Sequence, residues 1–164
     1  MPPIIIAAMS ATFTVRRADW ERDRERLRHV RTAVFVDEQS VPPALEWDGV
    51  DDSCLHVLAE DHRGAPIGTG RLLPDGHIGR MAVLAAWRGR GVGSAILSEL
   101  LRCAARQGLR EVVLNAQTHA LRFYERFGFS AEGAAFLDAG IEHKRMRRLL
   151  TQADVQATAA EGES

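Results

Sequence analysis

The chain has 164 residues, of which 46% are hydrophobic, and a formal net charge of −1 at pH 7. This length fits one domain with a real core, and the near-neutral charge argues against the strongly basic face that nucleic-acid binding needs. Only Cys54 and Cys103 are present, too few for a disulfide framework, and no stretch could span a membrane. We therefore expect a cytoplasmic protein with no nucleic-acid or membrane partner.

The two ends of the chain are expected to lie outside the domain. Residues 1–8 are apolar, but they lack the basic region of a signal peptide and are shorter than its apolar core. Met9 is a second candidate for the first residue of translation. Residues 151–164 are small and polar, which predicts a disordered tail. One domain is thus predicted over residues 12–150, after an N-terminal extension of residues 1–11.

The first elements in chain order are a strand and a long charged helix. Residues 12–17 alternate weakly and predict the strand, and Asp19 is suited to cap a helix that runs to about Val36. Five residues at helical spacing mark the inner face of this helix: Leu27, Val30, Arg31, Val34 and Phe35. Residues 40–52 contain two prolines and a glycine, which indicates a loop or a broken short helix.

The next elements predict an antiparallel meander. Residues 55–60, 67–73 and 78–84 form three apolar runs separated by short turns, with no crossover helix between them. Further strands are predicted at 111–116, 130–137 and 142–149, and Gly108 is expected to end the helix that precedes the first of these. The pattern indicates a mixed α/β (α+β) fold rather than a doubly wound nucleotide fold.

A glycine-rich segment joins the third strand of the meander to an amphipathic helix. The segment reads Arg88-Gly89-Arg90-Gly91-Val92-Gly93, and helical spacing of apolar residues follows it from Ala95. The start of a helix has unpaired N–H groups and the positive end of the helix dipole, and glycines let a ligand approach the backbone. With two arginines beside it, the segment predicts a site for phosphate.

Comparison with known phosphate-binding motifs reduces the number of candidate ligands for this segment. A nucleotide P-loop would need Lys followed by Ser or Thr, and the dinucleotide pattern would need glycine where Ser94 stands. The remaining pattern, Arg88-x-x-Gly91-x-Gly93, resembles the pyrophosphate-binding signature of the GNAT superfamily of acetyl-CoA-dependent N-acetyltransferases. Taken alone, the segment could equally be an ordinary turn with solvated arginines.

A second segment resembles the same superfamily. It reads Ala120-x-x-Phe123-Tyr124-x-x-x-Gly128-Phe129 and lies on a predicted helix that Gly128 ends. In that superfamily the tyrosine lies near the sulfur of the cofactor and can protonate the departing thiolate. Periodicity alone would instead make Tyr124 one more aromatic residue on a buried helix face. The two segments together favour the family interpretation.

Five further segments are similar to the ElaA-like branch of this superfamily, so that the resemblance covers residues 13–150. They are Arg31-Thr32-Ala33-Val34-Phe35-Val36-Asp37-Glu38-Gln39, Glu46-Trp47-Asp48, Gly68-Thr69-Gly70-Arg71-Leu72, Ile78-Gly79-Arg80-Met81-Ala82-Val83 and Ala139-Gly140-Ile141-x-His143. The resemblance implies a mostly antiparallel sheet of six to seven strands flanked by helices. It also implies that two strands separate at the cofactor site.

The resemblance further implies acetyl-CoA as cofactor, CoA as product and a primary amine as acceptor, on a small molecule or a peptide. The residues expected to bind the cofactor are Met81, Ala82, Val83, Arg88, Gly89, Arg90, Gly91, Val92, Gly93, Ser94, Asn115 and Tyr124. The backbone near Val83 would stabilise the oxyanion, and Tyr124 would protonate the thiolate.

The general base is expected in an acidic loop that would border the acceptor in this fold. Glu46 ranks first, as base or as anchor for a cationic amine, ahead of Asp48, Asp51 and Asp52. A merely solvated acidic loop is equally consistent with the sequence. His77, His119 and His143 also lie in or near the matched segments, and each is expected to be structural.

Two other classes of function stay open. Cys54 and His56 would share one face of a strand and could form a thiol or metal site, although no third group stands near them in sequence. We expect no metal site. The chain could also be a CoA-binding regulatory or interaction module without turnover, which Tyr124 argues against. Exposed strand edges make a homodimer plausible.

Overall fold

The computed structural model describes residues 12–156. The predicted N-terminal extension, with Met9 as a second start, and residues 157–164 of the predicted tail lie outside the described residues. Residues 152–156 form a short helix, which the prediction of a disordered tail did not include. Within residues 12–156 no helix is long and apolar enough to cross a membrane.

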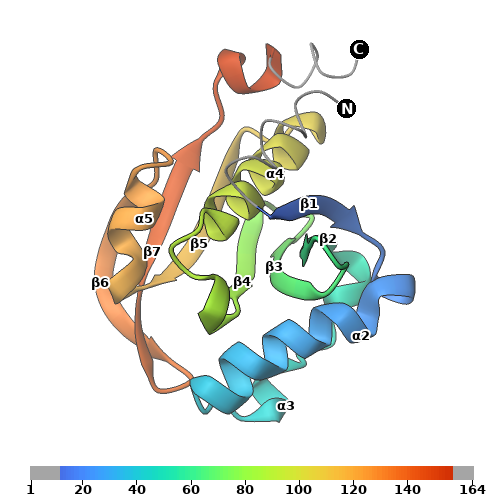
Figure 1. Ribbon diagram of the computed structural model, residues 1–164. Helices are drawn as coiled ribbons and strands as arrows, with labels where there is room; N and C mark the ends of the chain where they lie inside the picture. The colour runs from blue at the N-terminus through green and yellow to red at the C-terminus, as the bar shows by residue number, and fades with distance from the viewer. Residues whose placement is uncertain (1–11, 157–164) are drawn as a thin grey trace. The chain divides into compact units, whose positions relative to one another are not determined.

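Seven strands form one hydrogen-bonded sheet (Figure 1). They are β1 (Phe13–Ala18), β2 (Leu55–Asp61), β3 (Pro66–Leu72), β4 (His77–Val83), β5 (Glu111–Gln117), β6 (Ser130–Asp138) and β7 (Ile141–Leu149). Their order is β1-β2-β3-β4-β5-β7-β6. β4 and β5 pair in parallel, whereas β1–β2, β5–β7 and β6–β7 are antiparallel, and tight turns join β2 to β3 and β3 to β4. The predicted mixed, mostly antiparallel sheet is confirmed.

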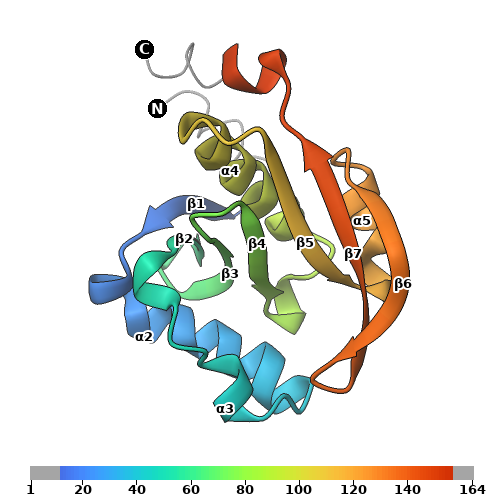
Figure 2. The same ribbon diagram turned by 180° about the vertical axis from the view of Figure 1, so that it is seen from behind.

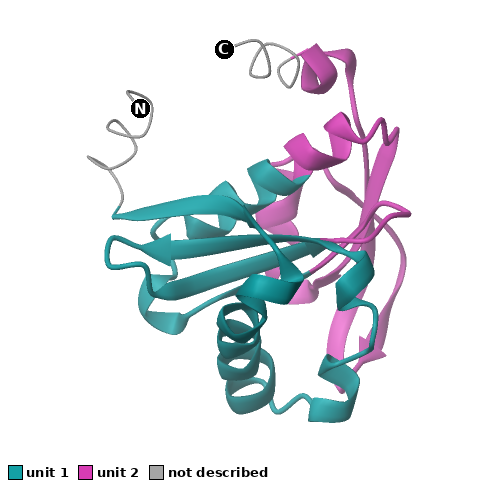
Figure 3. Cartoon of the chain, turned by 90° about the vertical axis from the view of Figure 1, so that its right-hand side faces the viewer, with its two compact units in different colours: residues 1–71, 80–100 teal, residues 72–79, 101–164 magenta. Residues whose placement is uncertain are grey.

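Within residues 12–156 the labelled helices are α2 (Trp20–Arg31), α3 (Pro43–Glu46), α4 (Val92–Arg106) and α5 (Leu121–Glu125), besides the short helix at residues 152–156. The described residues divide into two compact units (Figure 3). Unit 1 contains residues 12–71 and 80–100, and unit 2 contains residues 72–79 and 101–156. β4 and α4 each continue from one unit into the other. The prediction of a single domain over residues 12–150 stays a prediction.

In unit 1 the long helix begins where the sequence predicts. The Asp19 carboxylate accepts hydrogen bonds from the backbone N–H groups of Glu21 and Arg22, which caps α2. After Arg31 the chain continues as a π-helix over Thr32–Glu38, in which the turn is one residue wider. Along this helix every fourth residue or so is buried, and Val30 and Val34 pack with Ala82 of β4.

Strand β3 brings α4 unusually close to the sheet in unit 1. A Cβ atom at Gly68 would lie 2.8 Å from the Ile96 side chain, and one at Gly70 would lie 2.8 Å from Ile96 and from Leu100. A larger residue at either position would therefore require side chains of α4 to shift. Because side chains alternate along a strand, Thr69 and Arg71 point to the opposite face of the sheet.

Between two backbone hydrogen bonds that join the chains of β3 and β4, the β4 side contains one residue more than the β3 side. Backbone hydrogen bonds join Leu73 to His77 and Ile67 to Leu84, so β3 spans six residue steps between these pairs and β4 spans seven. Arg80 lies within this interval and has a left-handed backbone, with φ +51°. An additional residue of this kind in one strand of a pair is a β-bulge.

In unit 2, β5, β7 and β6 lie side by side, with α5 packed against β5 and β6 (Figure 2). The parallel ladder between β4 and β5 consists of two pairs, His77–Val113 and Ile78–Leu114. Beyond Ile78, β4 continues into unit 1 while β5 remains in unit 2. The predicted separation of these strands at the cofactor site therefore stays a prediction.

Candidate active site

The glycine-rich loop follows β4 and a short 3-10 turn at Ala85–Trp87, and it leads into α4. Gly89 and Gly91 have left-handed backbones, with φ +77° and +85°. A Cβ atom on either residue would meet nothing within 4 Å. These glycines are thus required by the backbone conformation, and the space beside the loop is open to a ligand.

The start of α4 has the form that binds anions. The first intrahelical hydrogen bond runs from the N–H of Ala95 to the carbonyl of Gly91 over 3.1 Å, so the helix starts at Val92. The N–H groups of Val92, Gly93 and Ser94 therefore belong to the first turn, where no carbonyl of the helix can accept them. They coincide with the positive end of the helix dipole.

The two arginines of the loop have partners within unit 1. Arg88 donates two hydrogen bonds to the Glu38 carboxylate, at 2.6 and 2.7 Å, and its Nε donates to the carbonyl of Val83 over 3.0 Å. The bonds from Arg88 hold the pKa of Glu38 below its ordinary value. The Arg90 guanidinium lies over the ring of Trp87, 4.9 Å from its centroid. Both arginine side chains therefore already have partners, whereas the backbone at Gly89 and Gly91 has open space beside it.

Three carboxylates of the predicted acidic loop form a cluster with three arginines. We call it the buried ion cluster, and it consists of Arg31, Arg71, Arg80, Glu46, Asp48 and Asp51. The Arg31 side chain is 1% exposed, and it donates from Nε to Glu46 and from Nη1 to Asp51, each over 2.7 Å. Arg31 also stacks on Trp47, 4.7 Å from the ring centroid.

The other two arginines complete the buried ion cluster from β3 and β4. Arg71 donates two hydrogen bonds to Asp48, of 2.6 and 3.1 Å, and one to Asp51, of 2.9 Å. Arg80 Nε lies 3.1 Å from Glu46 Oε2. Four of the six side chains are at most 6% exposed, whereas Arg80 and Asp48 are 25% and 33% exposed. All six are ion-paired, which offsets the cost of burying their charges, although Nε of Arg71 and Nε of Arg80 are buried without a hydrogen-bond partner.

The cluster shifts the pKa of its carboxyl groups in opposite directions. Burial raises the pKa of Glu46, and Arg80 and Arg31 offset this only in part. Burial would also raise the pKa of Asp48, but the hydrogen bonds and charge of Arg71 outweigh it and lower the pKa to about 2. The pKa of Asp51 is lowered in the same way by Arg31 and Arg71.

The solvated setting that the sequence left open for the acidic loop does not hold for Glu46 and Asp51. Glu46 is 2% exposed and bound by Arg31 and Arg80, and Asp51 is 5% exposed and bound by Arg31 and Arg71. Sequence reasoning missed this function for the arginines. The one available signal was Arg31 on the predicted inner face of the helix. The role of Glu46 as base or cation anchor stays a prediction.

The proposed thiol or metal pair is occupied by other contacts. The Cys54 thiol donates to the carbonyl of Val50 over 3.2 Å, and burial raises the pKa of the thiol. His56 Nε2 bonds to the carbonyl of Asp51 over 2.8 Å, and its ring stacks on Trp20. Within residues 12–156 no group of three or more His, Cys, Asp and Glu side chains could hold a metal ion.

Tyr124 lies in unit 2 among other aromatic side chains. It makes edge contacts with Phe123 and Phe129, with ring centroids 5.0 and 5.9 Å apart. Burial raises the pKa of Tyr124 to about 12, so its hydroxyl keeps its proton at neutral pH. Asn115 is exposed on β5 and pairs with Arg145 of β7.

The three histidines near the matched segments also lie in unit 2. His77 Nδ1 bonds to the Asp75 carboxylate over 2.9 Å, and His143 Nδ1 bonds to the carbonyl of Ile141 over 2.6 Å. His119 is exposed. The structural role expected for these histidines stays a prediction.

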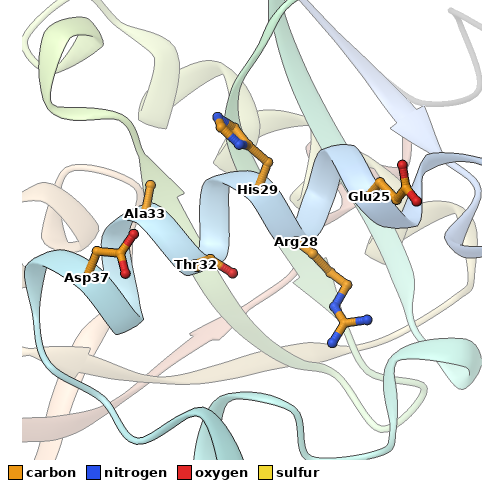
Figure 4. A pocket seen from close by; sticks show the side chains of 6 residues that line it. All are labelled: Glu25, Arg28, His29, Thr32, Ala33 and Asp37. Atoms are coloured by element: carbon orange, nitrogen blue, oxygen red, sulfur yellow. The ribbon is translucent and has the colours of Figure 1, made fainter.

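A groove of about 390 Å³ runs along the outer face of α2 and the π-helix in unit 1 (Figure 4). Its lining contains both signs of charge and a hydroxyl, and consists of Glu25, Arg28, His29, Thr32, Ala33 and Asp37. These residues recur at helical spacing, so one helix face supplies all of them. The Arg28 guanidinium lies over the ring of Trp47, 4.5 Å from its centroid.

The chain matches a known family over most of its length. The family described as "Acetyltransferase (GNAT) domain" matches residues 22–150. The Bacillus subtilis protein YjcF, described as an N-acetyltransferase, is 39% identical over 124 residues, which cover 73% of this chain and 88% of YjcF. Protein ElaA of Escherichia coli is 32% identical over 135 residues, which cover 77% of this chain and 88% of ElaA.

Solved structures show the same likeness. The crystal structure of an acyl-CoA N-acyltransferase from Pseudomonas aeruginosa has a TM-score of 0.74 and 32% identity, covering 83% of this chain and 99% of that one. The structure of Escherichia coli ElaA has a TM-score of 0.73 and 29% identity, with the same two coverages. The fold and the matches define an acyl-CoA-dependent N-acetyltransferase. The chain belongs to the GNAT acetyltransferase family, and its likeness to ElaA confirms the predicted branch.

Proposed function

We propose that the chain transfers the acetyl group of acetyl-CoA to a primary amine by direct attack of the amine on the thioester. The glycine loop at the start of α4 carries this proposal. Its first-turn N–H groups suit a pyrophosphate, and the space beside Gly89 and Gly91 is open. The match to an acyl-CoA N-acyltransferase at 32% identity supports the same cofactor.

In this reaction the amine nitrogen bonds to the carbonyl carbon, the carbon–sulfur bond breaks, and the thiolate takes a proton. We assign that proton to Tyr124, because a pKa of about 12 keeps its hydroxyl protonated. The backbone N–H near Val83 is proposed to stabilise the oxyanion, and Met81, Ala82 and Asn115 to contact the cofactor. A cytoplasmic location and a homodimer stay predictions.

The cofactor is tested by thermal stability. Acetyl-CoA or CoA at about 100 times its dissociation constant should stabilise the protein by about 2.7 kcal/mol, whereas ATP and NAD at equal concentration should do much less. Equal shifts in melting temperature for all four compounds would contradict the assignment.

The loop is tested by a matched set of variants. Gly93→Val should abolish CoA binding, because a branched side chain would stand between the ligand and the first-turn N–H groups. Gly93 is the cleaner probe, since Gly91→Val would also force valine into a left-handed backbone. Arg90→Ala should only weaken binding, because its guanidinium stacks on Trp87. Unchanged affinity in Gly93→Val, by calorimetric titration, would make the loop an ordinary turn.

Turnover is tested at Tyr124 with a panel of amines. Tyr124→Phe keeps the ring and should lower turnover about 100-fold, with CoA affinity and melting temperature unchanged. Wild-type turnover in this variant would assign the residue to packing alone. Slow hydrolysis of acetyl-CoA with no acceptor in the whole panel would favour the other candidate, a CoA-binding module without turnover.

Glu46 stays our proposal for the base, and burial raises its pKa above the ordinary value of a glutamate, which makes its carboxylate a better proton acceptor. Glu46→Gln should lower acceptor-dependent turnover and leave CoA affinity intact. Because Glu46 also pairs with Arg31 and Arg80, turnover must be compared at a temperature where circular dichroism shows the variant to be fully folded. An unchanged rate would leave Glu46 with its structural contacts only.

A further inference from the structure

Arg80 has a backbone conformation that its residue type disfavours. Its φ of +51° lies in the left-handed region, where a side chain clashes with the following carbonyl. Gly79, directly before it, has no such φ, although glycine would adopt it at no cost. A strained residue of this kind persists only where its surroundings fix it.

The surroundings of the Arg80 side chain are the turn at residues 43–48. Its Nη2 donates to the carbonyls of Leu45 and Glu46 over 3.2 and 3.1 Å and reaches Asp48 at 3.3 Å. Its Nε lies 3.1 Å from the Glu46 carboxylate, which Arg31 holds from the other side. Contacts with two carbonyls and two carboxylates thus hold the Arg80 guanidinium in one position.

The Arg80 main chain is fixed independently of its side chain. The hydroxyl of Thr69, which is 1% exposed on β3, donates to the carbonyl of Arg80 over 3.1 Å. A β-bulge removes a residue from the regular ladder and leaves its carbonyl without the usual N–H donor. The Thr69 hydroxyl replaces that donor.

We propose that Arg80 and Thr69 are positioning residues, and that they hold the β4 bulge so that residues 81–83 present their backbone to the acetyl thioester. This proposal rests on the function proposed above. One additional residue in a strand reverses which backbone groups face the neighbouring strand. The conformation of Arg80 therefore decides which N–H and C=O groups of Met81, Ala82 and Val83 are left free by β3.

The test compares Arg80→Gly with Arg80→Ala. Both variants lose the guanidinium and leave Glu46 equally short of one partner, but only glycine adopts the left-handed backbone freely. We expect kcat/KM for acetyl-CoA in Arg80→Ala to be roughly tenfold below that in Arg80→Gly, with both measured on folded protein. A purely structural ion pair would lower the melting temperature of both and leave the two kcat/KM values equal, which would overturn the proposal.

A second pair serves if both Arg80 variants fail to fold. Thr69→Val keeps the shape but deletes the hydroxyl, and it should lower kcat/KM about fivefold. Thr69→Ser keeps the hydroxyl and should restore kcat/KM to within about twofold of the wild type. Equal kcat/KM in the two Thr69 variants would overturn the proposal.

The activity of the wild type separates a failure of the proposed function from a failure of the role proposed for Arg80 and Thr69. If the wild type neither binds CoA nor acetylates any amine, the proposed function fails and this proposal fails with it. If the wild type is active while each matched pair shows equal kcat/KM, the proposed function stands and only the role of Arg80 and Thr69 is wrong.

Discussion

Each of the two units contains a set of arginines bound to carboxylates, and the two sets differ in burial rather than in geometry. In the buried ion cluster of unit 1, the side chains of Arg31 and Glu46 are 1% and 3% exposed and lie 2.7 Å apart. In unit 2, Arg147 and Glu132 are 35% and 41% exposed and lie 3.0 Å apart. Removing one partner leaves a buried charge uncompensated in the first set, whereas water replaces it in the second.

The origin of the two sets also differs. In unit 2, Glu132 is paired with Arg145 across neighbouring strands, and Arg147 bonds both Glu132 and Glu111, so strand register alone brings these side chains together. In unit 1 the partners come from a helix, a turn and two strands. A change in any of these elements alters the whole cluster.

The largest expected effect comes from Arg31→Met. This change keeps the bulk of the stem but leaves Glu46 and Asp51 each short of a partner, so the free energy of unfolding should fall by about 3–5 kcal/mol. Arg147→Met is the matched control and should barely move the urea midpoint, because its partners are exposed. Equal shifts in the two midpoints would mean that burial does not distinguish the sets.

A smaller effect is expected from Asp48→Asn and depends on pH. The pKa of Asp48 is about 2 in the folded protein, below the ordinary value of 3.8, so its contribution is present above about pH 4 and is lost as the pH falls toward 2. Glu46 acts with the opposite sign, because its raised pKa favours protonation of the folded state.

The free energy of unfolding of Asp48→Asn should therefore change less than that of the wild type between about pH 5 and about pH 3. Urea titrations at both values would measure this. An equally steep loss of stability in the two proteins would show that Asp48 is not among the carboxylates responsible for acid unfolding.

The smallest effect is expected from salt. Raising sodium chloride to about 1 M should weaken the coupling between Arg147 and Glu132 in a double-mutant cycle, because the screening length in water then falls to about 3 Å and both side chains are exposed. The coupling between Arg71 and Asp51, whose side chains are both 6% exposed, should keep its value. A loss of both couplings in salt would indicate that water and ions enter the buried ion cluster.

Local signals predicted much of this fold. Asp19, followed by Leu27, Val30 and Val34 at helical spacing, predicted the capped helix, and the glycines at 89 and 91 predicted the loop before α4. Each of these signals acts within a few residues. The local residue types are therefore enough to predict the backbone conformation at these positions.

Contacts between distant residues could not be predicted in the same way. Arg31 meets Glu46 and Asp51, which stand 15 and 20 positions away, and nothing in their local patterns pairs them. At β4, the sequence offers Gly79 as the natural left-handed residue, yet Arg80 has that conformation because tertiary contacts outweigh its local preference. The roles assigned to Tyr124 and to the cofactor residues come from a family resemblance and await their experiments.

The two glycines of β3 limit how sequences of this fold can change. A side chain at Gly68 or Gly70 would lie too close to Ile96 on α4, so either the Ile96 side chain or the helix that carries the glycine loop would have to shift. In a random mutagenesis library, folded variants substituted at either position should be enriched in smaller residues at position 96, and those substituted at Gly70 also in smaller residues at position 100. The location of the loop thus depends on two residues that stand about twenty positions before it in the chain.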